Sequence, residues 1–189
     1  FSLFREYVAQ LMEYNKKFLI IGNKNALSYK DVFSLIKYNK VWLGYNSPSD
    51  FTYNGEPTKK ITGLTRWFTN IENRKRNEFL STGKKYYGFE KMYPKYDNYD
   101  AINVDKVNDI PMDYFGVMGV PITFMDKYNP EQFEIIDGLN RYTILDIAQI
   151  NNWAKANHIH LTEINGKSKY LRILIRRLKN DNEDISTSN

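Results

Sequence analysis

Residues 1–23 have the sequence FSLFREYVAQLMEYNKKFLIIGN, in which a helical pattern is followed by a short apolar run. The spacings of three and four residues that mark one helix face join Leu3, Tyr7, Val8, Leu11 and Tyr14. The apolar run at residues 18–21 then predicts a buried strand. A helix of an α/β unit normally follows a strand, so we expect this chain to start in the middle of a fold.

The next residues repeat the alternation of helix and strand. After a predicted turn at residues 22–25, Ser28 is the expected N-cap of a second helix, with Asp31 near its positive end. The apolar face of that helix consists of Val32, Phe33, Leu35 and Ile36. A short apolar run at residues 41–45 predicts another strand. This order is typical of parallel crossover units and predicts the second half of a doubly wound α/β sheet.

Composition limits the chemistry that the chain can perform. The 189 residues include no Cys, which excludes disulfides, thiolate nucleophiles and sulfur-ligated zinc. The two His residues, His158 and His160, lack a third His or a Cys to complete a metal site, so packed or solvated imidazoles are the favoured interpretation. We find no secretion leader and no apolar run near the ~20 residues that span a bilayer. A reducing cytoplasm is the predicted location.

Positive charge is concentrated in one segment. Between Lys59 and Lys95 there are ten Lys or Arg and three acidic residues, a local charge of +7, whereas the whole chain carries +5 and its remainder therefore −2. The stretches TRWFTNIENRKRNEF and TGKKYYGFEK interleave these cations with aromatic residues. Such a mixture suits phosphate contact and base stacking, although a solvated charged surface with buried aromatics accounts for it equally well.

The rest of the chain predicts further core elements. They are a strand at residues 122–125 after Pro121, a strand at residues 133–139, a helix at residues 141–155 and a terminal strand at residues 170–178 with Arg172 and Arg176 on a polar face. No glycine loop of a nucleotide site is evident. The acids that could hold a divalent cation are Asp97, Asp100, Asp105, Asp109 and Asp113, although a solvated acidic loop is the favoured interpretation.

Several long blocks resemble a known family. They are FSLFREYV, KKFLIIGN, WFTNIENRKR, YPKYDNYDAINV, GVMGVPITFMDKYNPEQFEI and RILIRR. Together they are similar to the EcoRI-type adenine-specific DNA methyltransferases over nearly the whole chain, to about residue 179. In that family an Asn-Pro-Pro-Phe motif stands directly before SLFREYV. The resemblance therefore implies that Phe1 is the last residue of this motif, and that the half which binds S-adenosylmethionine precedes it.

The resemblance also implies a chemistry. The family transfers a methyl group from S-adenosylmethionine to the N6 amino group of an adenine that is flipped out of double-stranded DNA. Phe1 would stack on the flipped ring, although a frayed terminal residue is the alternative for this chain. Asn23, at the end of a strand, would line the base pocket, although a turn Asn is the simpler interpretation. Neither a metal nor a histidine is required.

We assign DNA contact to the segment in which positive charge is concentrated, which forms an excursion from the predicted sheet. The predicted DNA-binding residues are Lys59, Lys60, Arg66, Arg74, Lys75, Arg76, Lys84 and Lys85. Trp67 and Phe68 are predicted to pack in the core. Residues 46–65 match no family block clearly, so the target sequence is left open.

The resemblance predicts four segments. They are residues 1–46 as the C-terminal half of the catalytic sheet, 47–110 as the DNA-recognition excursion, 111–179 as remaining core strands and a helix packed on that sheet, and 180–189 as a disordered tail. We expect the fragment alone to be inactive, and its unpaired sheet edge could drive self-association. The alternatives to a methyltransferase are a stand-alone DNA-binding module and a metal-dependent nuclease that uses the acids between Asp97 and Asp113.

Overall fold

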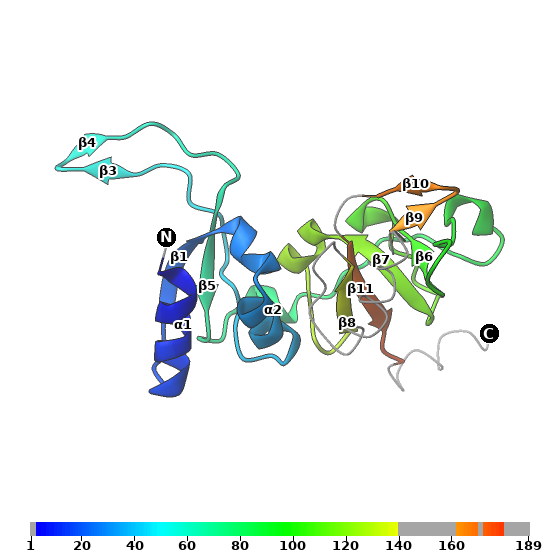
Figure 1. Cartoon of the computed structure of the whole chain (residues 1–189), viewed down its shortest axis with the longest axis horizontal. Helices are drawn as coiled ribbons and strands as arrows, with labels where there is room; N and C mark the ends of the chain where they lie inside the picture. Colours follow the sequence, from blue (N-terminus) through cyan, green and yellow to red (C-terminus); the bar gives the residue numbers. More distant parts are fainter. Residues whose placement is uncertain (1–2, 140–161, 170–171, 180–189) are drawn as a thin grey trace. The chain divides into compact units, whose positions relative to one another are not determined.

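Figure 1 shows the computed structural model of the chain, which describes residues 3–139, 162–169 and 172–179. The chain divides into two compact units, Phe1–Asn77 and Glu78–Asn189. Among the described residues, no helix has both the length and the apolar character needed to cross a membrane. The predicted helix at residues 141–155, His158, His160, the predicted tail and Phe1 all lie outside the described residues.

The first unit is an α/β structure built on a three-stranded sheet. Its elements are α1 (Phe4–Glu13), β1 (Leu19–Asn23), η1 (Lys24–Ser28), α2 (Lys30–Lys37), β2 (Trp42–Leu43), β3 (Thr52–Tyr53), β4 (Glu56–Pro57), β5 (Thr65–Thr69) and η2 (Arg74–Asn77). The sheet has the order β1-β5-β2, and β3 and β4 form a separate two-stranded sheet (Figure 1). The predicted alternation of helix and strand over the first 45 residues is confirmed.

Strand directions explain how this sheet is assembled. Both β1 and β2 run antiparallel to β5, so they are parallel to each other and α2 connects them. This agrees with the predicted crossover, but β5 returns from later in the chain and lies between the two parallel strands. The described sheet is therefore mixed, with β1 and β2 as its edges.

Two local predictions in this unit were wrong. Gly22 and Asn23 belong to β1, and the turn is replaced by η1. Ser28 does not cap α2; its hydroxyl donates to the carbonyl of Asn25 at 2.7 Å, and Tyr29 takes the N-cap position without a side-chain bond. The reason is that Ser28 is the last residue of η1, one position before the N-cap of α2, and its side chain bonds back into η1.

Phe68 lies at the centre of the first unit. Its side chain is fully buried on β5, and its ring meets that of Phe4 edge-on at 5.0 Å between centroids. Gly22 lies opposite, because a Cβ at Gly22 would come within 2.5 Å of Phe4 and 2.8 Å of Phe68. The predicted apolar face of α1 is only partly correct, since Val8 is buried while Leu3, Tyr7 and Tyr14 are exposed.

The second unit contains a four-stranded sheet and a small hairpin. Its elements are η3 (Glu90–Met92), β6 (Ile102–Asn103), η4 (Val107–Asp109), β7 (Val117–Pro121), η5 (Ile122–Asp126), β8 (Phe133–Leu139), β9 (Glu163–Ile164), β10 (Lys167–Ser168) and β11 (Arg172–Arg177). The sheet order is β6-β7-β11-β8, with β6 parallel to β7 and β11 antiparallel to both neighbours. The predicted strand at residues 122–125 was wrong, because Pro121 ends β7 and η5 follows it.

The boundary between the compact units falls inside the predicted excursion. Residues 47–77 complete the first sheet through β5, and residues 78–110 contribute Tyr93, Tyr96 and Ile102 to the core of the second unit. The described strands of residues 111–179 pair within the second sheet or the hairpin. The predicted division into catalytic and DNA-recognition segments depends on which residues bind the cofactor and the DNA, and it stays a prediction.

Candidate nucleic-acid interface

Because β1 and β2 are parallel, their carboxyl ends lie at the same end of the first sheet, which we call its carboxyl edge. β1 ends at Asn23, which is directly opposite Thr65, the first residue of β5. The Asn23 side chain accepts a hydrogen bond from the Asn25 amide at 2.9 Å, so it caps η1. The amide of Lys24 donates to the carbonyl of Leu64 at 2.8 Å. Sites of α/β folds form at such edges, and a role for Asn23 there stays a prediction.

The predicted DNA-binding cations divide between the two units. Lys59 and Lys60 follow the β3–β4 hairpin, Arg66 lies in β5, and the basic run Arg74, Lys75 and Arg76 forms most of η2. Lys84 and Lys85 belong to the second unit. The first unit thus carries six of the eight predicted cations.

The environments of these six cations differ. Lys59 and Lys60 are exposed, and Lys60 pairs with Asp50 at 3.5 Å where both side chains are mostly in solvent. Arg66 is half-buried and donates to the carbonyl of Thr65 at 2.9 Å. Exposed pairs contribute little to stability because water and salt screen them, so Lys60 can exchange Asp50 for a phosphate at small cost.

Within the basic run, Arg76 has a structural role. Its guanidinium lies 3.9 Å from the centroid of the Trp42 ring and pairs with Glu72 at 2.6 Å, and only 15% of its side chain is exposed. Lys75 donates to the carbonyl of Gly44 at 3.4 Å. Arg74 is exposed. Because the contacts of Arg76 and Lys75 fasten η2 to β2, Arg74 is the cation of this run that is best placed to reach a phosphate.

A tyrosine cluster supports the segment that contains Lys84 and Lys85. Asp113 accepts hydrogen bonds from the amides of Tyr86 and Tyr87 at 2.6 and 3.4 Å. The Tyr86 ring packs against Tyr114 at 4.4 Å between centroids. Both lysines are exposed, as are Tyr87 and Phe89. The sequence left bracing and base stacking open for these aromatics; Tyr86 braces the loop, and Tyr87 faces solvent.

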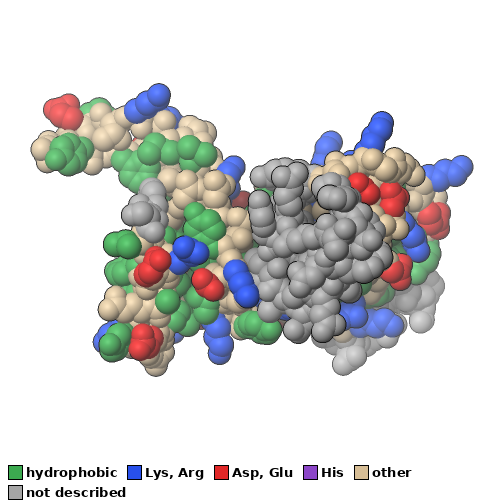
Figure 2. Space-filling view, in the orientation of Figure 1, with side chains coloured by type: hydrophobic (Ala, Val, Ile, Leu, Met, Phe, Trp, Pro, Cys, Tyr) green, Lys and Arg blue, Asp and Glu red, His purple; other side chains and the backbone are tan. Residues whose placement is uncertain are grey.

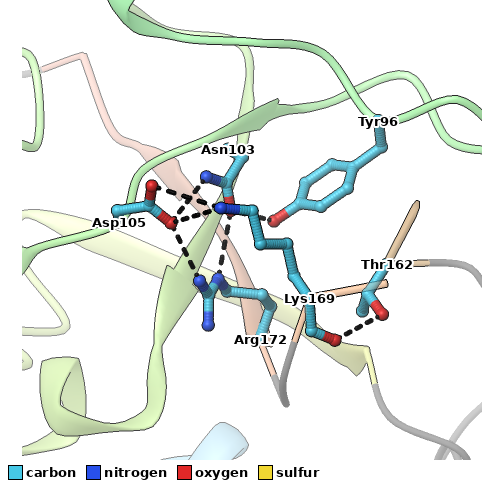
Figure 3. A network of polar contacts seen from close by, with 6 residues as sticks. All are labelled: Tyr96, Asn103, Asp105, Thr162, Lys169 and Arg172. Atoms are coloured by element: carbon cyan, nitrogen blue, oxygen red, sulfur yellow. Dashed lines mark hydrogen bonds and ion pairs between the residues drawn. The ribbon is translucent and has the colours of Figure 1, made fainter. Parts of the chain in front are cut away.

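A polar network in the second unit was missed by the sequence analysis (Figure 3). Arg172, only 8% exposed, donates to Asn103 Oδ1 at 3.1 Å and to Asp105 Oδ1 at 3.0 Å. Tyr96 donates its hydroxyl hydrogen to the same Asn103 oxygen at 2.8 Å, and Lys169 pairs with Asp105 at 3.3 Å. The predicted polar face of the last strand was wrong for Arg172, because this network satisfies its charge inside the unit.

The network shifts the acidity of two of its members. The hydrogen bond from Asn103, helped by Lys169 and Arg172, holds the pKa of the Asp105 carboxyl below its ordinary value, although partial burial opposes this. Burial raises the pKa of the Tyr96 hydroxyl, despite the nearby guanidinium of Arg172. At neutral pH, Asp105 is therefore an anion and Tyr96 a neutral donor.

Four of the five candidate metal-binding acids have separate partners, with those of Asp113 described above. Asp97 accepts from the amides of Asn165 and Gly166, Asp100 pairs with Lys95, and Asp105 belongs to the network. In the part of the chain that the structure describes, no group of three His, Cys, Asp or Glu residues could hold a metal ion. These contacts give the acids structural roles, and the structure does not bring them together for a nuclease.

The sequence of residues 1–178 matches the model of a family described as adenine-specific methyltransferase EcoRI. The chain belongs to this family. It is 45% identical to the Type II methyltransferase M.EcoRI of Escherichia coli, over 93% of this chain and 55% of that protein. It is 41% identical to the Type II methyltransferase M.MgeORF184P of Mycoplasma genitalium, over 94% of this chain and 62% of that protein. The predicted resemblance is confirmed.

A third relative gives the same result. The chain is 36% identical to the Type II methyltransferase M.MpnI of Mycoplasma pneumoniae, over 95% of this chain and 62% of that protein. It thus spans between 55% and 62% of the length of these three EcoRI-family relatives. No solved structure matches it.

A methyltransferase family implies a methyl donor such as S-adenosylmethionine. The space beside four glycines is filled by aromatic side chains of this chain: Phe4 and Phe68 at Gly22, Trp67 at Gly44, Tyr114 at Gly116, and Tyr96 at Gly119. The glycines with positive φ lie in hairpin turns or loops; they are Gly55, Gly63, Gly83, Gly88 and Gly166. None of these loop glycines joins a strand directly to an α-helix, which is the arrangement of a glycine loop that holds a nucleotide-like cofactor.

Proposed function

We propose that this chain is the DNA-engaging part of a methyltransferase that acts on the N6 amino group of adenine in double-stranded DNA. The observation that carries the proposal is the family match over residues 1–178, together with 45% identity to a Type II methyltransferase. The methyl donor is S-adenosylmethionine, held by residues other than those described. The enzyme acts in a restriction–modification setting in the cytoplasm.

The first unit also supports the proposal. Its two parallel strands, joined by a helix and separated by a reversed strand, are compatible with the end of a larger doubly wound sheet. Its exposed cations supply the sequence-independent attraction that duplex binding requires. We assign the target base to the carboxyl edge near Asn23, and the phosphate backbone to Arg74, Lys59 and Lys60.

The test is methylation in a host without adenine methylation of its own. The chain, with any residues that its gene encodes on either side, is expressed, and genomic DNA is sequenced for N6-methyladenine. We expect methylation at one recurring sequence, with none in cells that carry an empty vector. If expressed protein leaves the DNA unmethylated, the proposed activity is wrong.

Arg74→Gln is expected to weaken duplex binding by this chain and to lower the slope of log affinity against log salt by about 1, because one phosphate contact is lost. Arg76→Gln instead removes the contact between the guanidinium and the Trp42 ring, so we expect it to loosen η2 from β2. Fluorescence anisotropy with a labelled duplex at several salt concentrations measures both variants. Lys40→Gln, at an exposed lysine outside the predicted set, is the charge-matched control. An Arg74→Gln slope equal to that of wild type removes Arg74 from the interface.

The 189-residue chain is expected to bind no S-adenosylmethionine at concentrations up to a millimolar, because its described glycines form no cradle. Isothermal titration calorimetry measures this directly. A micromolar dissociation constant would place the cofactor within this chain and refute the assignment.

A further inference from the structure

The first unit has a projecting β-ribbon, and family membership alone does not explain its role. Between β2 and β5 the chain leaves the sheet, forms the β3–β4 hairpin and returns, and Figure 1 shows this hairpin extending away from β1 and β5. Every residue from Thr52 to Leu64 is exposed. We call residues 48–64 the ribbon. A long exposed excursion of this kind suits contact with a partner.

The ribbon is ordered by its own hydrogen bonds. The Thr58 amide donates to the carbonyl of Phe51 at 2.8 Å, and the Ile61 amide to that of Ser49 at 2.8 Å. The hairpin turns through Asn54 and Gly55, with φ values of +50° and +83°. Two successive residues with positive φ form the tight turn that suits the twist of paired strands. The ribbon therefore presents its tip in a defined conformation before any partner binds.

The base of the ribbon adjoins the edge where the target base is proposed to bind. Thr65, which ends the ribbon's return path, pairs with Asn23 at the carboxyl end of β1, and its hydroxyl donates to the carbonyl of Pro48. The amide of Lys24 donates to Leu64 at 2.8 Å. Asn23 and the ribbon are thus joined by direct contacts within one unit. A partner held by the ribbon lies beside that edge.

Charges along the ribbon balance. Residues 48–64 contain Asp50, Glu56, Lys59 and Lys60 and no other charged side chain, so their net charge is zero. Figure 2 shows hydrophobic, acidic and basic side chains interspersed over the hairpin. Tyr53, 73% exposed, lies directly opposite Glu56 in the register, so both project from the same face of the tip. The two cations, Lys59 and Lys60, lie on the return path toward β5, where they can contact phosphates, whereas the tip has donors and acceptors for base edges.

We propose that the ribbon enters the major groove of DNA and that Tyr53, Asn54 and Glu56 contact base edges next to the target adenine. This assignment rests on the proposed function, and it separates sequence recognition by the ribbon's tip from phosphate attraction by Lys59, Lys60 and the basic run. The major groove, about 12 Å wide and 8.5 Å deep, admits a two-stranded β-ribbon. The five steps along the backbone from Ser49 to Asn54 span roughly 17 Å at ~3.3 Å each, which exceeds the depth of the groove.

The test compares wild type with the double variant Tyr53→Ala/Glu56→Ala, which keeps the Asn54–Gly55 turn. Each 189-residue protein is used to enrich bound duplexes from a randomised pool, which are then sequenced. We expect wild type to select one sequence and the variant to lose roughly 10-fold or more of its preference for that sequence, the effect of losing one good base contact. The salt slope should stay unchanged, because neither side chain neutralises a phosphate.

Tyr38→Ala is the matched control, because Tyr38 is an equally solvent-facing tyrosine, 58% exposed, at the end of α2. Circular dichroism verifies that each variant is folded. If the variant selects the wild-type sequence with unchanged preference, or if wild type binds all duplexes alike, the ribbon assignment fails and the proposed methyltransferase function stands. If wild type binds no duplex, DNA engagement by this chain fails, and the ribbon assignment fails with it.

Discussion

Phe68→Ala is expected to lower the free energy of unfolding of the first unit by about 3–5 kcal/mol, the range measured when a buried aromatic is truncated to Ala. Phe68 has no exposed surface and lies on β5, which pairs with both other strands of the sheet. Its ring fills the space between Phe4 and the backbone of Gly22. With Gly22 unable to fill the gap, truncation leaves a cavity, so the loss falls toward the upper end of this range.

Tryptophan fluorescence during urea unfolding measures this effect in one unit. The chain has three tryptophans, of which Trp42 and Trp67 belong to the first unit. In a Trp153→Phe background the signal therefore reports on that unit alone. Leu19→Ala is the control, because Leu19 lies on the same sheet with 54% of its surface exposed, and its truncation should cost well under 1 kcal/mol. Equal losses in the two variants would contradict Phe68 as the centre of this core.

Local patterns were sufficient to predict α1, β1, α2 and β2. The 3.6-residue period of α1 and the apolar runs of β1 and β2 are properties of adjacent residues, so the sequence alone reveals them. The pairing of β5 with β1 joins residues more than 40 positions apart, which no local pattern encodes. The N-cap failed for a related reason, because Ser28 has two competing uses and only the packed structure selects one.

The same limit applied to the candidate site, because contacts between residues distant in the sequence decide the environment of each side chain. Composition located the basic run, but it could not distinguish Arg74 from Arg76, since the difference is the Trp42 ring beneath Arg76. Likewise, alternation along β11 placed Arg172 and Arg176 on one face. Arg172 is buried because Asn103 and Asp105 meet it from 69 and 67 residues away. A lone Arg between apolar residues was the available signal, and its partners could not be inferred from spacing.

Arg172→Met is expected to destabilise the second unit by about 2–3 kcal/mol. The change removes two charge-assisted hydrogen bonds, to Asn103 at 3.1 Å and to Asp105 at 3.0 Å. Breaking a fully buried ion pair costs about 3–5 kcal/mol, but Asp105 is partly exposed and can regain water, so the loss is smaller. Arg176→Met on the same strand is the matched control. Its guanidinium pairs with Glu134 at 2.8 Å, with both side chains about half exposed, and its loss should cost under 1 kcal/mol.

The two Arg variants should also differ in how stability depends on pH. Because folding lowers the pKa of Asp105 below its ordinary value of 3.8, ionised Asp105 stabilises the native state above about pH 4, and this contribution disappears as the pH falls through the folded pKa. Without Arg172 the folded pKa moves back toward the ordinary value. The difference in unfolding free energy between wild type and Arg172→Met is therefore largest near neutral pH and becomes smaller below pH ~4. Any such difference for Arg176→Met does not involve Asp105. Hydrogen exchange of the β11 amides at pH 7 and pH 3.5, corrected for intrinsic rates, measures both differences. A difference for Arg172→Met that is unchanged at the lower pH would show that Asp105 is not coupled to Arg172, and that packing of the arginine stem alone stabilises β11.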